Sequence, residues 1–385
     1  MPVVCGMKTE IDGHMNYKKA TREILIMNKS LKKTALAALC SFAIGVSGTA
    51  LVSSPSEAGT ELRALTWEGY TDQSVIDVFT EKTGCTLVPT YVGSNDEITA
   101  KMAGGGGGYD VISPAVDNSQ LMAGMGVLEP LDPARLEHFD EIYASFRDHP
   151  GVQADGKIWA MPMAWGSIPI MYRTDKFDSP PTSATVLFDP KYKGKIGIQN
   201  VKSSMYLTAR IIYGADFDVY DMTDEQLEAV KQKMIAQKPL VRTYWSSAGE
   251  LIELYANGEI WVSETWGGYQ FSQLQEMGIP VAELLPTEKA DGWQDVWNIV
   301  KGSENIDCAY QWINFISGPD GQCGMVRVAG YSAANPSAVA DCLTDEVKRD
   351  LHLDDLNYAD GLDFWKLPPR IGKYVEVWNE ILAAE

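Results

Sequence analysis

The sequence is poor in positive charge and in histidine. Its 385 residues include 32 Lys and Arg against 52 Asp and Glu, with four His, and the net charge at pH 7 is −20. Binding to nucleic acid or to anionic membrane surfaces depends on clustered basic side chains, so neither is expected as a partner. The acidic balance is compatible with a cationic ligand, although we expect most of the carboxylates to form a solvated surface.

The spacings of a metal centre and of a serine hydrolase are also missing. His138, His149 and His352 are far apart and the cysteines follow no zinc pattern, so we predict no metal and no cofactor. The nucleophile motif Gly-x-Ser-x-Gly is absent. Five glycines at 104–108 precede a predicted strand and lack a following Lys-Ser/Thr, which excludes a phosphate loop. A secreted hydrolase with paired carboxylates remains an alternative at this point.

Residues 27–58 have the pattern of a secretory signal peptide. A basic segment at 27–33 precedes an apolar, small-residue run at 34–51, and residues 56–58 (Ser-Glu-Ala) resemble a cleavage site. Gly and Ser within the run argue against a retained membrane span. We therefore expect residues 1–26 to be a dispensable or untranslated extension, 27–58 to be removed, and the mature protein to be free in the periplasm.

Four cysteines follow the predicted signal peptide, and export permits disulfide bonds. Cys308, Cys323 and Cys342 are close in sequence, so we predict one bridge among them and favour Cys323–Cys342 over Cys308–Cys323. Cys85 lies in an apolar run and is predicted to be a buried thiol.

The chain after residue 58 begins with an α/β pattern. Strands are predicted at 61–66, 85–91 and 109–114, and helices at 71–83 and after Ser94, which forms a capping-box pattern with Glu97. This order predicts a mostly parallel sheet, in which ligands bind beyond the carboxyl ends of the strands. Trp67 and the segment 113–117 lie at such ends.

A second α/β region follows two extended apolar segments at 158–165 and 167–172. Further strands are predicted at 189–198, 259–266 and 279–285, and helices at 203–213, 223–237, 247–257, 305–317, 319–329 and 374–384. The chain leaves the first region near 160–170 and returns near 293–300, so two crossover segments would form a hinge. We predict lobe 1 from 59–165 and 297–385, with the C-terminal helices, lobe 2 from 166–296, and a ligand cleft between them.

The returning segment 291–300 carries Trp293, Asp295 and Trp297 at every second position. Alternate side chains of a strand point to one side, so two indoles and a carboxylate would share a face. Aromatic faces around a negative charge are suited to binding an organic cation. We predict a binding role for Trp293 and Asp295, whereas Trp297 fits the cleft and the core about equally well.

A set of short motifs resembles the periplasmic solute-binding proteins of ABC importers, in particular the spermidine/putrescine-binding family with the type II periplasmic binding fold. The resemblance covers nearly all of the mature chain. Its motifs are Trp67-x-x-Tyr70, Ser94-Asn-Asp-Glu97, Tyr109-Asp-Val-Ile-Ser-Pro114, Trp165-Gly166, Tyr192-Lys-Gly-Lys195, Asn257-Gly-Glu259 with Trp266, Trp293-Gln-Asp295, and Ala329-Gly-Tyr331 with Asn335.

The resemblance implies a non-enzymatic, monomeric receptor that binds putrescine or spermidine between its lobes and delivers it to an ABC permease in the inner membrane. Family positions that face the ligand correspond here to Trp67, Tyr70, Trp266, Trp293, Asp295 and Tyr331. Two further candidates stand where the family has other residues: Glu68 replaces a Thr, and Asp117 replaces a Tyr. By strand alternation alone, Glu68 would face solvent.

Other departures bear on the ligand. The family's further acidic pair corresponds to Val201 and Ser204, neither of which is a carboxylate, and a C-terminal Gln corresponds to Lys366, with Arg370 nearby. A long polyamine needs a carboxylate for each ammonium, whereas an amino-acid-like zwitterion needs fewer and a cation for its acid end. A receptor for such a zwitterion or for a quaternary amine is therefore the alternative within the binding class.

Overall fold

The computed structural model describes residues 60–105, 107–353, 358–359 and 361–384. The predicted extension and signal peptide lie outside this part of the chain. Within the described residues, no helix has the length and apolar character needed to cross a membrane.

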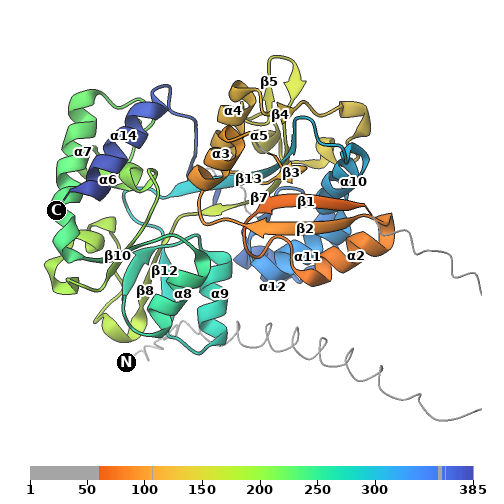
Figure 1. Cartoon of the computed structure of the whole chain (residues 1–385). Helices are drawn as coiled ribbons and strands as arrows, with labels where there is room; N and C mark the ends of the chain where they lie inside the picture. The colour runs from red at the N-terminus through yellow and green to blue at the C-terminus, as the bar shows by residue number, and fades with distance from the viewer. Residues whose placement is uncertain (1–59, 106, 354–357, 360, 385) are drawn as a thin grey trace, which may run out of the picture. The chain divides into compact units, whose positions relative to one another are not determined.

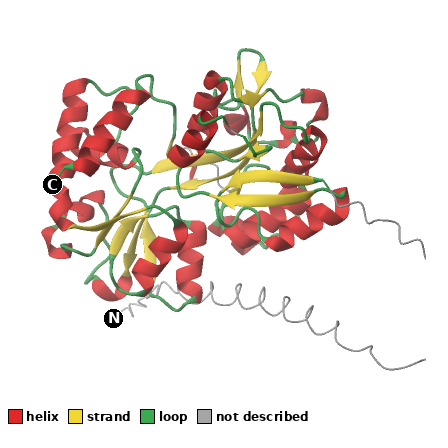
Figure 2. Cartoon of the chain, in the orientation of Figure 1, coloured by secondary structure: helices red, strands yellow, loops and turns green. Residues whose placement is uncertain are grey.

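Two mixed β-sheets flanked by helices organise the described residues (Figures 1 and 2). The larger sheet has eight strands: β1 (Glu61–Thr66), β2 (Thr86–Tyr91), β3 (Val111–Ile112), β4 (Leu128–Glu129), β7 (Met161–Ser167), β13 (Asp291–Val300), β14 (Ser332–Ala333) and β15 (Asp363–Phe364). The smaller sheet has five: β8 (Ile170–Arg173), β9 (Ile196–Gln199), β10 (Val241–Trp245), β11 (Val262–Glu264) and β12 (Val281–Leu284). A separate hairpin pairs β5 (Gln153–Ala154) with β6 (Lys157–Ile158).

Most of the α-helices lie where the sequence pattern predicts them. They are α2 (Gln73–Thr83), α3 (Asn95–Ala103), α4 (Val116–Met125), α5 (Ala144–Arg147), α6 (Ser204–Tyr213), α7 (Asp224–Gln237), α8 (Ala248–Ala256), α9 (Gly268–Glu276), α10 (Ile306–Ser317), α11 (Pro319–Ala329), α12 (Asp345–Asp350) and α14 (Ile371–Ala383). Short 3₁₀ turns occupy Pro133–Arg135, Phe139–Glu141, Thr174–Lys176, Ala184–Phe188, Pro190–Tyr192, Lys238–Leu240 and Ser337–Val339.

The predicted cap of α3 is present in a modified form. Ser94 Oγ accepts a hydrogen bond from the backbone N–H of Glu97 at 3.1 Å, as the capping-box pattern predicts. The Glu97 carboxylate accepts instead from the N–H of Gly93, one residue before the cap. The helix start is therefore fixed by two side-chain contacts within five residues.

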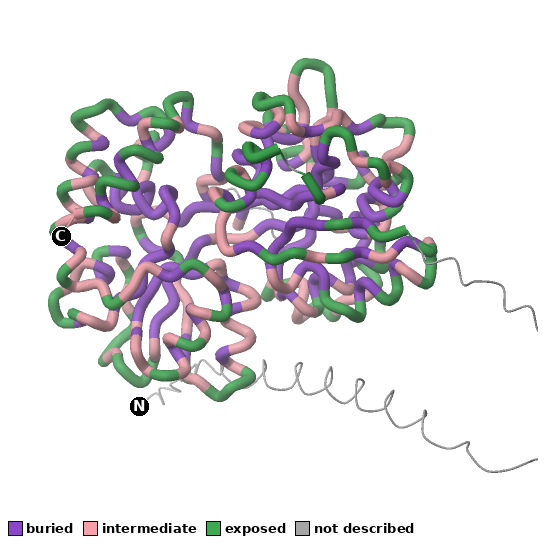
Figure 3. Tube along the Cα trace, viewed as in Figure 1, coloured by how far each residue is buried: buried purple, intermediate pink, exposed green. Residues whose placement is uncertain are grey.

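The antiparallel pairs of the larger sheet come mainly from one long strand. β1 pairs in parallel with β2 and β3, as the opening pattern predicts, but β13 runs antiparallel to β3, β4 and β7. The sheet is therefore mixed and less parallel than predicted, because the returning chain inserts between β3 and β7. All ten residues of β13 are buried (Figure 3).

The chain changes sheets where the extended segments predict. β7 belongs to the larger sheet and β8 to the smaller one, and the return runs from β12 to β13. A further passage, not predicted, leads from β15 to α14, which lies against α7 (Figure 1). Lys231 joins the two helices through an ion pair of 2.7 Å with Glu380.

Two disulfide bonds join the four cysteines of the described chain. The predicted Cys323–Cys342 bridge is confirmed. The prediction of a free thiol at Cys85 is wrong, because Cys85 is bonded to Cys308 at the start of α10, 223 positions away. Packing of α10 beside the start of β2 brings these two residues together, and no local sequence pattern reports that contact.

Candidate functional site

The first wall of the site follows the end of β1. The Trp67 indole N–H donates to the carbonyl of Ser113, after β3, at 2.6 Å, which holds the ring across two strand ends. Gly69 has a φ of 93° and turns the chain, so that the next residue, Tyr70, points back inward. The Tyr70 hydroxyl then donates to Asp295 Oδ2 at 2.6 Å. Both aromatic residues thus lie at the carboxyl end of a strand, where ligands of α/β sheets bind.

The second wall comes from β13 and its neighbour β7. The Trp293 indole N–H donates to the carbonyl of Ser167 at 3.1 Å, and its ring lies directly over Gly166. A Cβ at residue 166 would be 2.6 Å from Trp293 Cζ2, so only glycine leaves room for this ring. The Tyr331 ring meets Trp293 edge-on at a centroid distance of 4.8 Å. The Trp165-Gly166 and Gly-Tyr331 motifs therefore both hold the Trp293 ring in place.

The third wall, Trp266, follows β11 of the smaller sheet. Its backbone N–H donates to the Gln270 side chain at 2.8 Å, and its ring meets Trp67 edge-on at a centroid distance of 5.7 Å. Trp245 packs behind it at 5.4 Å and is fully buried. Trp67 and Trp266 thus bring the strand ends of the two sheets into contact.

These walls line a partly open cavity of about 500 Å³, a volume that includes the open space at its mouth. Its lining is Trp67, Glu68, Tyr70, Ser94, Asn95, Gln199, Val201, Trp266, Trp293, Asp295, Tyr331 and Trp365. Seven of the eight predicted site residues are therefore brought together. The eighth, Asp117, is absent from the lining and lies buried in the first turn of α4.

Asp295 is the buried acid of this cavity. Burial raises the pKa of Asp295 to about 7, the charge of Asp117 acts in the same direction, and the hydrogen bond from Tyr70 opposes the shift. Among the described residues, none forms an ion pair with Asp295. The site thus offers a desolvated carboxyl to which the protein brings aromatic rings and a hydroxyl, without a positive charge.

Two of the expectations about individual side chains change. Glu68 lines the cavity, in contrast to the solvent-facing position that alternation alone predicts, because β1 ends at Thr66 and alternation does not continue into the turn. Trp297 does belong to the face that carries Trp293 and Asp295, but α10 covers it: its ring meets Trp312 at 5.3 Å. Trp297 is therefore a core residue.

The C-terminal cations do not line the cavity. Arg370 pairs with Asp224 at 2.7 Å, and Lys366 lies 3.9 Å from Asp363. The residue that does reach the cavity is Trp365, which the sequence motifs did not predict. Ser94, Asn95 and Gln199 also line the cavity and were not predicted. The first two belong to the Ser94–Glu97 motif and the third ends strand β9, so only their position in the chain could have indicated this role.

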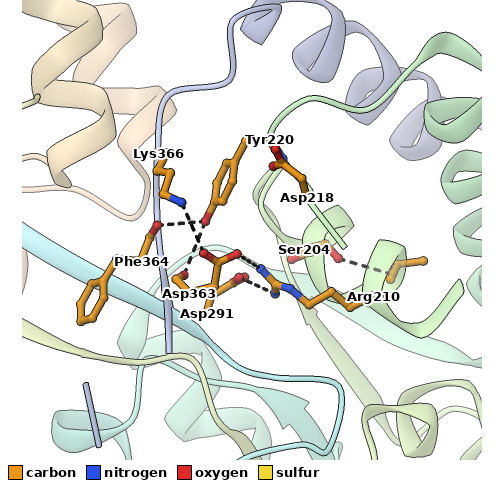
Figure 4. Close-up of polar contacts among 9 residues, drawn as sticks. Ser204, Arg210, Asp218, Tyr220, Asp291, Asp363, Phe364 and Lys366 are labelled. Carbon is orange, nitrogen blue, oxygen red and sulfur yellow. Dashed lines mark hydrogen bonds and ion pairs between the residues drawn. The ribbon is translucent and has the colours of Figure 1, made fainter. Parts of the chain in front are cut away.

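Two ion-pair groups join segments of the two sheets around the cavity. Lys202, after β9, is buried and lies 3.1 Å from Asp96 of α3. Arg210 of α6 is fully buried and bonds Asp291 at 2.7 Å and Asp363 at 2.6 Å, at the starts of β13 and β15 (Figure 4). These contacts fix the positions of the crossover strands relative to α6.

Another acid, Glu264, is buried at the end of β11. Its carboxylate accepts from the Ser204 hydroxyl at 2.9 Å and from the Gln199 N–H at 3.3 Å. Burial raises the pKa of Glu264 to about 7, and both hydrogen bonds oppose this shift. Glu264 thus places a carboxyl next to Ser204, where the resemblance implied that an acid was missing, although it does not belong to the cavity lining.

Comparison with known proteins assigns the family. The profile of the bacterial extracellular solute-binding proteins matches residues 74–354. The chain belongs to this family. Its members bind solutes and are not enzymes, so the hydrolase alternative is dropped.

Individual relatives are distant. The putrescine-binding periplasmic protein SpuD of Pseudomonas aeruginosa is 25% identical over 291 residues, which cover 72% of this chain and 79% of SpuD. A putative spermidine/putrescine ABC transporter structure from Listeria monocytogenes superimposes with a TM-score of 0.75 at 23% identity, covering 85% of this chain and all of that one. MotA of A. tumefaciens B6 in complex with glucopine gives a TM-score of 0.72 at 19% identity, covering 84% and 99%. The structural matches confirm the α/β periplasmic binding fold.

Proposed function

We propose that this protein is the periplasmic substrate-binding component of an ABC importer, and that it captures a polyamine such as putrescine or spermidine. The observation that carries the proposal is the buried Asp295 carboxyl, unpaired by any cation of the described chain and enclosed by Trp67, Trp266 and Trp293. An ammonium there gains a charge-assisted hydrogen bond of about 1.5–3 kcal/mol and cation–π contacts of about 0.5–2 kcal/mol each. The polyamine-binding names of the distant relatives support the same ligand class.

Binding is coupled to closure of the two lobes, 59–165 with 297–385 and 166–296, except that α14 lies against α7 and therefore goes with the second lobe. The cavity takes residues from both, including Trp67 of the first and Trp266 of the second. A ligand that contacts both walls favours the closed state in proportion to its difference in affinity for the two states. The closed, monomeric receptor then delivers the ligand to a permease in the inner membrane, after export by the signal peptide at 27–58.

A second candidate ligand is an amino-acid-like zwitterion. Val201 and Ser204 carry no acid, and the adjacent Lys202 places a buried cation beside the cavity lining. The likeness to MotA, a structure in complex with glucopine, is compatible with this candidate. Against it, Lys202 is already paired with Asp96.

Isothermal titration calorimetry distinguishes these ligands. Protein unfolded, dialysed and refolded to remove any bound solute is titrated with putrescine, spermidine, γ-aminobutyrate and betaine. We expect binding of at least one polyamine. Binding of γ-aminobutyrate or betaine without either polyamine would replace the ligand class and keep the site, and mass spectrometry of the solute released on unfolding would identify it directly.

A further inference from the structure

A second cavity adjoins the first and contains an acid that the proposed site does not use. It measures about 460 Å³ and shares Trp266 and Tyr331 with the cavity of Asp295. Its other polar lining comprises Glu283, Asp350, His352 and the hydroxyls of Ser167, Ser332 and Tyr358. Whereas the first cavity is mainly aromatic, this one combines polar side chains and two acids with glycines and aromatic rings.

Glu283 is the unusual member of that lining. It lies on β12, opposite Met171 of β8, and its Oε1 atom is buried without a hydrogen-bond partner. Burial raises the pKa of Glu283 to about 8. The residue as a whole is half-buried, but a buried carboxyl oxygen without a partner is unfavourable, and in native structures such an atom calls for a specific explanation. An ammonium group in the cavity would supply both the missing donor and the missing charge.

One side chain, Tyr331, lines both cavities. Burial raises the pKa of the Tyr331 hydroxyl, and the negative charges of Asp295 and Glu283 act in the same direction, so both acids act on the same phenol. The Tyr331 ring is fixed by its contacts: it meets Trp293 edge-on, and a Cβ at Gly268 would lie 2.5 Å from its Cδ1 atom. The two cavities are thus neighbours that share this aromatic residue.

We propose that Glu283 forms a second ammonium subsite, so that a ligand with two ammonium groups is held by Asp295 at one end and by Glu283 at the other. Its carbon chain would pass along Trp266 and Tyr331, the two residues shared by both cavities. This inference rests on the proposed function, since it assumes an amine at Asp295. It also explains how a receptor without acids at positions 201 and 204 can still match each ammonium with a carboxylate.

Paired ligands and matched variants test the subsite. Putrescine and n-butylamine have the same carbon chain and differ in the second ammonium, so calorimetry with both isolates it. In the wild-type protein we expect putrescine to bind at least about ten-fold more tightly than butylamine, as one charge-assisted hydrogen bond provides. Glu283→Gln should remove most of that difference and leave butylamine affinity within about two-fold, while Asp295→Asn should weaken both amines.

Glu276→Gln is the matched control, because it removes the same charge from the exposed end of α9, the helix whose first residue, Gly268, lines this cavity. It should leave both affinities unchanged. Equal affinities of the wild-type protein for putrescine and butylamine, or a Glu283→Gln variant that retains the full difference, would overturn the subsite while amine binding at Asp295 stands. If the wild-type protein binds neither of these amines, the subsite falls; if it binds no spermidine either, the proposed polyamine ligand falls with it.

Discussion

Tyr70 and Asp295 are joined by a hydrogen bond of 2.6 Å across 225 positions of sequence. The phenol belongs to the turn after β1 and the carboxylate to the middle of β13. This bond connects the outgoing chain of the larger sheet with the strand that returns from the smaller one. It also keeps one oxygen of Asp295 oriented while the carboxyl remains available to a ligand.

Replacement of Asp295 is expected to weaken every amine ligand. Asp295→Ala removes the charge-assisted hydrogen bond, worth about 1.5–3 kcal/mol, which corresponds to a loss of about ten-fold or more in affinity. Calorimetry measures the dissociation constant, and circular dichroism checks that the variant is folded. An unchanged affinity would show that Asp295 is not part of the site.

Amine affinity is expected to decrease in acid. The ammonium of an alkylamine keeps its proton below about pH 10, whereas the pKa of Asp295 in the protein is about 7. Binding the carboxylate form therefore requires release of a proton below that value, and affinity should fall by about ten-fold for each pH unit. Titrations at pH 8 and pH 5.5 test this dependence, which Asp295→Asn should flatten. Equal affinities at the two pH values would contradict it.

The ligand-free protein is expected to be more stable at mildly acid pH than at pH 8. The ordinary pKa values of 3.8 and 4.5 rise to about 7 for Asp295 and Glu264 and to about 8 for Glu283 in the folded protein. The folded state therefore holds these protons more tightly, and the resulting stabilisation is lost as the pH rises through the folded pKa values. A pKa that is higher by one in the folded state corresponds to at most about 1.4 kcal/mol of stability.

Urea unfolding at pH 5.5 and pH 8 measures this difference. The Glu283→Gln variant should show a smaller difference than the wild-type protein, because its side chain does not titrate. A wild-type protein that is equally or more stable at pH 8 would contradict the expectation for these acids.

Breaking the buried Arg210 cluster is expected to destabilise the fold strongly. Arg210→Met leaves Asp291 buried without its cation, although burial already raises the pKa of that carboxyl (Figure 4). Removal of one partner from a buried pair costs about 3–5 kcal/mol. The control Arg242→Met removes the exposed pair with Glu259 and should cost less than about 1 kcal/mol. Chemical denaturation measures both, and equal losses would contradict the expectation.

The two disulfide bonds are expected to contribute unequally to stability. Cys85–Cys308 closes 223 positions of chain and Cys323–Cys342 closes 19, so the first restricts the unfolded chain more. The loop-entropy relation gives a difference of about 2 kcal/mol in its favour. Paired Cys→Ser variants of each bridge, compared by thermal unfolding under oxidising conditions, measure the difference. A larger loss from the short bridge would argue against the entropic explanation.

Much of the local structure could be read from the sequence. β1 spans the predicted residues 61–66, and helices α10 and α11 end where predicted, because apolar periodicity and the Ser317-Gly-Pro319 break determine these elements locally. Strand β10 was not predicted, since its residues have no clear alternation and its position depends on pairing with β9. Seven residues that the short motifs singled out line the cavity. Most of them follow a strand end or lie in a turn, whereas Trp293 and Asp295 lie within β13, where strand alternation was the signal.

The sequence by itself determined that an indole and a carboxylate, Trp293 and Asp295, share one face of a strand, since alternation is a property of the extended backbone. Only the tertiary structure decided which parts of that face stay open. Trp297 has the same orientation but is covered by Trp312 of α10, whereas Asp295 meets Tyr70 and the aromatic walls of both sheets. Only the tertiary structure likewise brings Glu283 and Tyr331 into one cavity and forms the Cys85–Cys308 bond. Contacts between distant segments are set by how helices and sheets pack, and local periodicity carries no record of that packing.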